Sequence, residues 1–180
     1  MTSSTLSTLA TEIEGATGIN PATCYQCGKC SAGCPMAFES DLRPHQVMRR
    51  VMYGPTERAL QDESIWLCLT CETCSARCPN ACDPARVIDA VRELALESSL
   101  ANMPKNIGAF HKAFLEQIRT NGRLHEMGLV MDYKLKTGDL MKDVTNAPGM
   151  FARGKLNLRA DRIEGVAEVK RIFEQCGVTP

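Results

Sequence analysis

The sequence lacks an excess of charge of either sign. Lys and Arg together number 21 and Asp and Glu together number 21, so the formal net charge is +0. A neutral chain has no broad electrostatic field to attract nucleic acid or an anionic membrane surface. We therefore expect neither as a partner.

Long hydrophobic runs are also missing. No segment approaches the length of about 20 apolar residues that spans a bilayer. The first residues, Met1 to Gly18, have no basic start and no apolar stretch, and they include Glu12 and Glu14. This composition is unlike that of an export or organelle-targeting signal. We expect a cytoplasmic protein with no membrane insertion.

Recognisable machinery for substrate chemistry is absent as well. There is no glycine-rich phosphate loop, no pair of catalytic carboxylates and no nucleophile with its base at a known spacing. The three histidines, His45, His111 and His125, are scattered and form no ligand pattern. We predict no catalytic residue in this chain and expect substrate chemistry on another subunit.

Cysteine is what the sequence has in abundance. Ten cysteines occur in 180 residues, and nine of them lie between positions 24 and 82. In a reducing cytosol such crowded cysteines usually bind metal rather than form disulfides. The chemistry is therefore expected in the first half of the chain.

The cysteines form an internal repeat with the pattern Cys-x-x-Cys-x-x-Cys-x-x-x-Cys-Pro. A displacement of 44 residues superimposes the following positions: Cys24, Cys27, Cys30, Cys34 and Pro35 on Cys68, Cys71, Cys74, Cys78 and Pro79. With a displacement of 40, the repeat continues as Pro44, Val47, Met48 and Val51 against Pro84, Val87, Ile88 and Val91. Each half thus reads as a cysteine motif, a loop and a helix.

The helical expectation has clear signals. Pro44 and Pro84 suit the first position of a helix, Asp83 can cap the second helix, and Gly54-Pro55 can end the first. Further apolar stripes with helical spacing follow: Ile107, Phe110, Phe114 and Ile118, ending at Asn121-Gly122, and Ile163, Val166, Val169, Ile172 and Phe173. No segment alternates convincingly as a strand would.

We predict a mainly α chain with three parts. Residues 1–20 form an N-terminal arm, residues 21–98 a two-cluster domain, and residues 99–180 a helical and irregular region that docks partners. Within the last part, residues 123–160 contain five glycines or prolines and are predicted to be irregular and extended.

The motif spacing is typical of [4Fe–4S] clusters. In bacterial two-cluster ferredoxins the fourth cysteine of each such run binds the other cluster. By that logic the predicted ligands of cluster 1 are Cys24, Cys27, Cys30 and Cys78, and those of cluster 2 are Cys68, Cys71, Cys74 and Cys34. Paired Cys-x-x-Cys motifs also make zinc sites, but those normally use two ligands per knuckle and then a long gap. Zinc stays a remote alternative.

Other residues near the motifs have two interpretations each. Cys82, which has no cysteine counterpart in the first half, is either a ligand or redox thiol or, as we favour, a buried thiol near the second cluster. Cys176 is expected to be inert. Lys29 and Arg77 could raise cluster potentials or simply be solvated, and Trp66 could shield a cluster or belong to the core.

The runs Cys24 to Pro35 and Ile65 to Pro79 resemble the C subunit of heterodisulfide reductase, a similarity that covers residues 20 to about 98. The resemblance implies an alpha-helical ferredoxin fold and a non-catalytic electron-transfer subunit. Its partners would be a flavin-containing A subunit and a catalytic B subunit. Related complexes act on the coenzyme M–coenzyme B heterodisulfide or on other sulfur and thiol compounds, and that choice stays open.

Cluster binding should also drive folding, because eight metal–thiolate bonds close large loops in a segment with few large apolar side chains. Removing the clusters is expected to abolish much of the helical circular dichroism of the cysteine region. An unchanged spectrum after cluster removal would contradict this expectation.

Overall fold

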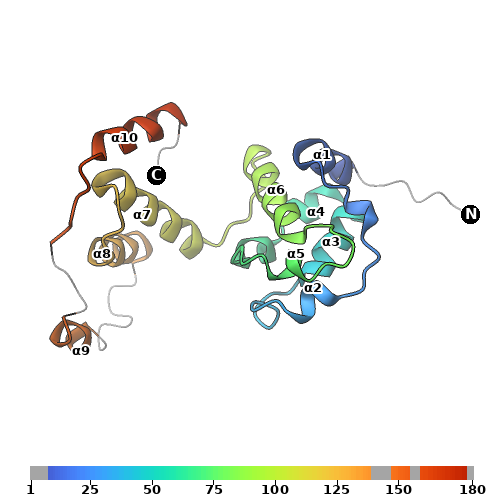
Figure 1. Cartoon of the computed structure of the whole chain (residues 1–180), viewed down its shortest axis with the longest axis horizontal. Helices are drawn as coiled ribbons and strands as arrows, with labels where there is room; N and C mark the ends of the chain where they lie inside the picture. Colours follow the sequence, from blue (N-terminus) through green and yellow to red (C-terminus); the bar gives the residue numbers. More distant parts are fainter. Residues whose placement is uncertain (1–7, 139–146, 155–158, 178–180) are drawn as a thin grey trace, which may run out of the picture. The chain divides into compact units, whose positions relative to one another are not determined.

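The computed structural model describes residues 8–138, 147–154 and 159–177. The chain divides into two compact units, Met1–Met103 and Pro104–Pro180 (Figure 1). Every regular element among the described residues is helical, which confirms the predicted mainly α fold. No helix in that part of the chain is both long and apolar enough to cross a membrane.

Unit 1 contains the cysteine repeat. Its elements in chain order are α1 (Thr8–Thr17), η1 (Pro21–Thr23), α2 (Lys29–Ala32), α3 (Pro44–Tyr53), α4 (Thr56–Leu60), η2 (Glu63–Leu67), α5 (Thr73–Ala76) and α6 (Pro84–Glu97). The longer helices α1, α3 and α6 pack on one another, with α4 against α3 and α6. The two short helices α2 and α5 also touch each other, so the two cysteine motifs meet.

The predicted helix boundaries of the repeat are confirmed. Pro44 and Pro84 open α3 and α6, and Gly54 follows the last residue of α3. The Asp83 carboxylate accepts a hydrogen bond from the Arg86 N–H and so caps α6. Local sequence signals therefore fix where the two supporting helices begin.

The core of unit 1 lies between α1, α3 and α6. Repeat-related side chains of α3 and α6 face inward and are almost wholly buried: Val47, Met48 and Val51 with Val87, Ile88 and Val91. Leu9, Ala10 and Ile13 of α1 complete this core, and Leu9 and Ile13 are 0% exposed. The segment predicted as an N-terminal arm thus contributes a core helix, and the chain divides after Met103.

Unit 2 contains α7 (Lys105–Asn121), α8 (Glu126–Thr137), α9 (Ala147–Ala152) and α10 (Val166–Gln175). Helix α7 packs against α8 and α10, and the Phe110 ring meets the Tyr133 ring edge-on at 5.9 Å between centroids. The Cα of Gly122, which ends α7 in a left-handed conformation, has no room for a Cβ beside Ile163. The predicted end of α7 at Asn121-Gly122 is confirmed.

The prediction that residues 123–160 are irregular and extended was wrong for much of this stretch, since α8 and α9 fall within it. Gly128 lies in the first turn of α8, where a glycine weakens a helix less than in its middle, and His125 Nδ1 accepts the Gly128 N–H at 3.1 Å. The remainder of α8 has neither glycine nor proline. Residues 139–146 and 155–158 lie outside the described residues.

Burial of α1 leads to the first structural test. Replacing Ile13 by alanine leaves a cavity in the core and should lower the free energy of unfolding by roughly 2–5 kcal/mol. The thermal unfolding midpoint of the cluster-containing protein measures the effect. Replacing the adjacent exposed Glu12 by alanine serves as the control, and equal effects of the two changes would show that α1 does not belong to the core.

Candidate metal centre

The two cysteine motifs have the same backbone conformation. Gln26 and Thr70, each just before the second cysteine, have left-handed φ angles of 61° and 49°. Gly28 and Glu72, each just after it, have φ angles of 77° and 60° and precede α2 and α5. Left-handed residues within such turns point successive N–H groups inward, a geometry that binds anions and occurs at iron–sulfur sites. Each motif therefore forms a concave loop suited to an anionic cluster.

Burial of the cysteines follows the repeat as well. The third cysteines, Cys30 and Cys74, are buried at the start of α2 and α5 and pack together with Ala85. The second cysteines, Cys27 and Cys71, are exposed. The remaining four, at the first and last positions of the motifs, are intermediate: Cys24, Cys34, Cys68 and Cys78. The two loops thus present their thiols in one pattern, with their buried members adjacent.

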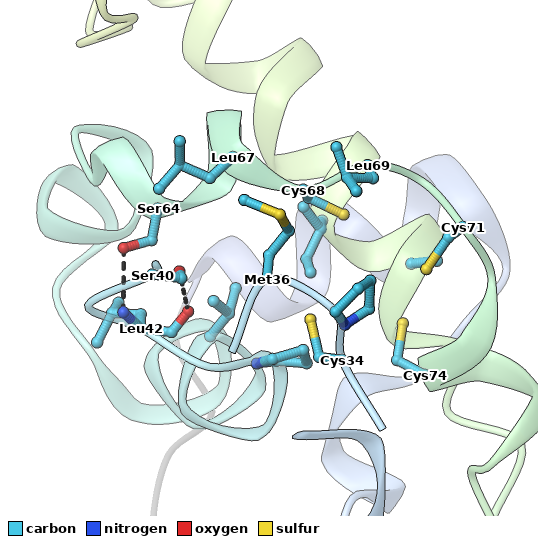
Figure 2. A pocket seen from close by; sticks show the side chains of 15 residues that line it. Cys34, Met36, Ser40, Leu42, Ser64, Leu67, Cys68, Leu69, Cys71 and Cys74 are labelled. Atoms are coloured by element: carbon cyan, nitrogen blue, oxygen red, sulfur yellow. Dashed lines mark hydrogen bonds between the residues drawn. The ribbon is translucent and has the colours of Figure 1, made fainter. Parts of the chain in front are cut away.

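One pocket brings Cys34 of the first motif together with three cysteines of the second. It is lined by Cys34, Cys68, Cys71 and Cys74, and by apolar side chains that include Met36, Leu67 and Leu69. Figure 2 shows the sulfur ends of these four side chains facing a common space at one end of the pocket. This set is the one predicted for cluster 2.

The loop that carries Cys34 is fastened over the same pocket. Ser64 Oγ accepts the Leu42 N–H at 3.0 Å, and Ser40 Oγ donates to the Leu42 carbonyl at 2.7 Å (Figure 2). The Leu42–Ser64 bond connects the chain after the first motif to η2, the element that leads into the second motif, and the Ser40 bond stabilises the loop itself. The loop that carries Cys34 is therefore held against the second motif by a contact outside the cysteines.

The reciprocal link joins the end of the second motif to the start of the first. The Asn80 amide donates to the Thr23 carbonyl, and Thr23 Oγ1 lies 3.3 Å from Cys82 Sγ. The pKa of the Tyr25 phenol is raised by desolvation and then by the neighbouring thiols of Cys27 and Cys78. The Cys78 turn consequently lies against the loop that carries the other predicted ligands of cluster 1.

A serine after each third cysteine ties the loop to the helix that follows. Ser31 Oγ accepts the His45 N–H of α3 at 3.1 Å, and Ser75 Oγ accepts the Ala85 N–H of α6 at 3.2 Å. Both donors are at the second helical position, where a backbone N–H has no partner inside the helix. The repeated Cys-Ser-Ala triplets were a sequence signal for this link, which our predictions did not use.

Arg77, for which tuning of a cluster and simple solvation were both left open, connects the two motifs. Its Nε donates to the Lys29 carbonyl at 3.3 Å, and its side chain fills the space that a Cβ at Gly33 would need. Arg77 therefore lies between the two loops rather than beside only one of them.

Arg92 of α6 was not singled out from the sequence, although its guanidinium contacts the second cysteine motif and the residues before it at several atoms. Its guanidinium donates to the Ile65 carbonyl at 2.7 Å and to the Cys68 carbonyl at 2.6 Å. It also lies 5.9 Å from the centroid of the Trp66 ring. Trp66 is 7% exposed, as expected for a core residue, and its Nε1–H has no partner in the described part of the chain.

Cys82 is 1% exposed, in agreement with a buried thiol, but it lies elsewhere than predicted. Its N–H donates to Cys78 Sγ at 3.3 Å, and the Cys24 and Cys78 thiols both raise its pKa after desolvation. Cys82 thus adjoins the set predicted for cluster 1, not cluster 2. Cys176 is exposed at the end of α10.

The three histidines have separate partners, and the Ser31 hydroxyl that His45 contacts lies 4.0 Å from Cys30 Sγ. His45 Nδ1 is 2.6 Å from Ser31 Oγ, His125 caps α8, and His111 packs near the Phe110 ring. In the described residues, no three Cys, His, Asp or Glu side chains stand close enough to share a single metal ion.

Burial disfavours the thiolate form at three of the cysteines. Burial raises the pKa of the Cys74 thiol to about 11, and burial also raises the pKa values of Cys30 and Cys68. A deprotonated ligand at these positions needs a compensating cation, which the irons of a cluster supply. Cysteine ligands on two adjacent loops with left-handed turns fit an iron–sulfur cluster.

Comparison with known proteins agrees with this chemistry. Residues 23–83 match the model of the 4Fe-4S dicluster domain. The chain is 24% identical over 151 residues to the iron–sulfur C subunit of the CoB–CoM heterodisulfide reductase of Methanopyrus kandleri, covering 66% of this chain and 79% of the relative. It is 31% identical over 103 residues to the C subunit of the H2:CoB–CoM heterodisulfide, ferredoxin reductase of Methanothermobacter thermautotrophicus. This match covers 55% of this chain and 54% of the relative.

A third relative is the C subunit of the ferredoxin:CoB–CoM heterodisulfide reductase of Methanosarcina acetivorans. It is 34% identical over 77 residues, which make up 43% of this chain and 31% of the relative. The predicted resemblance to the C subunit of heterodisulfide reductase is confirmed. Apart from the Methanopyrus protein, the chain spans about half or less of the length of these relatives.

The left-handed residues give a paired prediction. Glu72→Gly should raise the unfolding midpoint of the cluster-containing protein, because a left-handed non-glycine residue costs roughly 1–2 kcal/mol. Gly28→Ala should lower the unfolding midpoint, with a loss of stability of similar size. Nothing lies within 4 Å of the added Cβ, so backbone strain is the only expected effect. If both changes shift the midpoint in the same direction, the two loops do not share this conformation.

Proposed function

We propose that this chain is a non-catalytic electron-transfer subunit of a heterodisulfide reductase-type oxidoreductase complex, with two [4Fe–4S] clusters as its cofactors. The match to a dicluster domain and the similarity to the C subunits of several such reductases support this proposal. The observation that carries it is the pocket in which one cysteine of the first motif joins three of the second.

The ligand sets in this proposal are exchanged between the motifs. Cluster 1 takes Cys24, Cys27, Cys30 and Cys78, and cluster 2 takes Cys68, Cys71, Cys74 and Cys34. For cluster 2 the support is the shared pocket, and for cluster 1 it is the contact of residues 80 and 82 with Thr23. Both links tie one motif to the end of the other.

The protein side chains in this proposal bind and position, while the clusters supply one-electron chemistry. Thiolates hold the irons, inward backbone N–H groups stabilise the negative charge, and the apolar lining around Cys34 and Cys68 limits access of water. Because the buried Cys30 and Cys74 are adjacent, the two sites lie close enough to exchange electrons directly.

The expected partners are a flavin-containing A subunit and a catalytic B subunit, with this chain as the conductor between them. Unit 2, which includes most of the predicted docking region, exposes large apolar side chains on two helices: Phe114 of α7 and Val130, Met131 and Leu135 of α8. The terminal acceptor is either the coenzyme M–coenzyme B heterodisulfide or another sulfur or thiol compound. A cytoplasmic location suits the reduced cysteines that cluster assembly requires.

Two double variants test the exchange of ligands. If the sets are exchanged, Cys34→Ser with Cys68→Ser removes two ligands of one cluster and should leave about four irons per chain. Cys24→Ser with Cys34→Ser removes one ligand from each cluster and should damage both. Iron and sulfide analysis after anaerobic purification measures the outcome.

Pairing within each motif predicts the reverse result. The first double variant would then damage both clusters and the second would spare one. Thermal unfolding of unit 2 provides a folding control, because none of the substituted cysteines lies in that unit. A colourless wild-type protein that contains zinc would overturn the proposed function altogether.

The partners are tested by anaerobic purification of the tagged chain from its native host. We expect a flavoprotein and a B-type iron–sulfur subunit to co-purify. Subunits of a different sulfur- or thiol-metabolising oxidoreductase would support the alternative complex. A brown protein that purifies alone under gentle conditions would contradict its role as a subunit.

A further inference from the structure

Arg92 holds the segment that leads into the second cysteine motif. In addition to the Ile65 and Cys68 carbonyls, its guanidinium contacts Thr70 Oγ1 at 3.3 Å. Thr70 is the left-handed residue just before Cys71. One side chain therefore connects the first cysteine of the motif, the turn to the second and the preceding η2 element.

The charge of this side chain is permanent and partly shielded from water. A guanidinium stays protonated in proteins, and the Arg92 side chain is 18% exposed. Asp89 pairs with it at 3.0 Å but is 39% exposed, so water screens the carboxylate more than the guanidinium.

The first motif has no such cation at the related position. The displacement of 40 residues that superimposes α3 on α6 places Met52 opposite Arg92, and Met52 is 0% exposed. Arg77 does not produce the same difference, because it lies between both loops. Arg92 is thus a specific departure from the internal symmetry.

We propose that Arg92 is a positioning residue that raises the reduction potential of the cluster held by Cys34, Cys68, Cys71 and Cys74 above that of the other cluster. This inference rests on the proposed two-cluster function. Reduction adds negative charge to a cluster, and a fixed cation beside its ligand loop stabilises the reduced form. The transferred electron then resides preferentially on the cluster of the second motif.

Three substitutions form a charge series on the full-length, cluster-containing protein. Arg92→Gln removes the cation, Arg92→Lys keeps the charge without the guanidinium fork, and Asp89→Asn removes the opposing carboxylate. Redox titrations followed by electron paramagnetic resonance measure both potentials.

Arg92→Gln should lower the reduction potential of the cluster held by Cys34, Cys68, Cys71 and Cys74. The expected shift is at least about 59 mV for one electron, which corresponds to a tenfold change in the reduced-to-oxidised ratio. Asp89→Asn should raise the same potential, and Arg92→Lys should leave it within about a threefold change in that ratio, about 28 mV by the same constant. A purely structural role would lower cluster occupancy without producing shifts of opposite sign.

Arg86→Gln is the matched control, because this exposed arginine lies earlier on α6 and its substitution should move neither potential. In the Cys34→Ser, Cys68→Ser background, the remaining cluster should not respond to Arg92→Gln. Two intact clusters with unchanged potentials in the three variants would overturn this inference alone. A wild-type protein without two clusters would overturn the proposed function and this inference with it.

Discussion

The fold of unit 1 depends on bringing two cysteine loops, 44 residues apart in sequence, to the same place. The loops carry few large apolar side chains and need attachment from outside. Packing of α3, α6 and α1 fixes the two helices, and the serine hydroxyls of Ser31 and Ser75 attach each loop to its helix. Contacts between α2 and α5 then set the loops against each other.

The two cysteine motifs have similar backbone conformations and similar burial of their cysteines, but some related positions around them carry different residue types. Arg92 is opposed by Met52, and the buried Cys82 occupies the position related to Phe38, which is 93% exposed. His45 meets Ser31, whereas Asp83 accepts a hydrogen bond from Ser75. In the proposed two-cluster subunit, these differences are what distinguishes the two sites.

Much of this arrangement could be predicted because its signals are local. Motif spacing indicated the cysteine loops, and Pro44, Pro84 and Asp83 indicated the start of the supporting helices. The similarity to a 4Fe-4S dicluster domain could be predicted for the same reason, because the cysteines and their spacing are read directly from the sequence.

The parts that were missed depend on contacts between distant segments. The packing of α1 against α6 and the clamp from Arg92 to the residues around Cys68 have no local pattern. Helix α8 was missed because glycine generally disfavours helices. Gly128 lies in the first turn of α8, where a glycine weakens the helix less than in its middle. Cys82 was placed by proximity in sequence, whereas the chain turns it toward Thr23.

The central claim is that two adjacent clusters share one helical unit. Electron paramagnetic resonance of the fully reduced wild-type chain tests it most directly, because two paramagnetic clusters that are neighbours broaden and split each other's signals. We predict an interacting spectrum that integrates to about two spins, with about eight irons per chain. A single isolated signal with about four irons, or no signal in a zinc-containing protein, would contradict it.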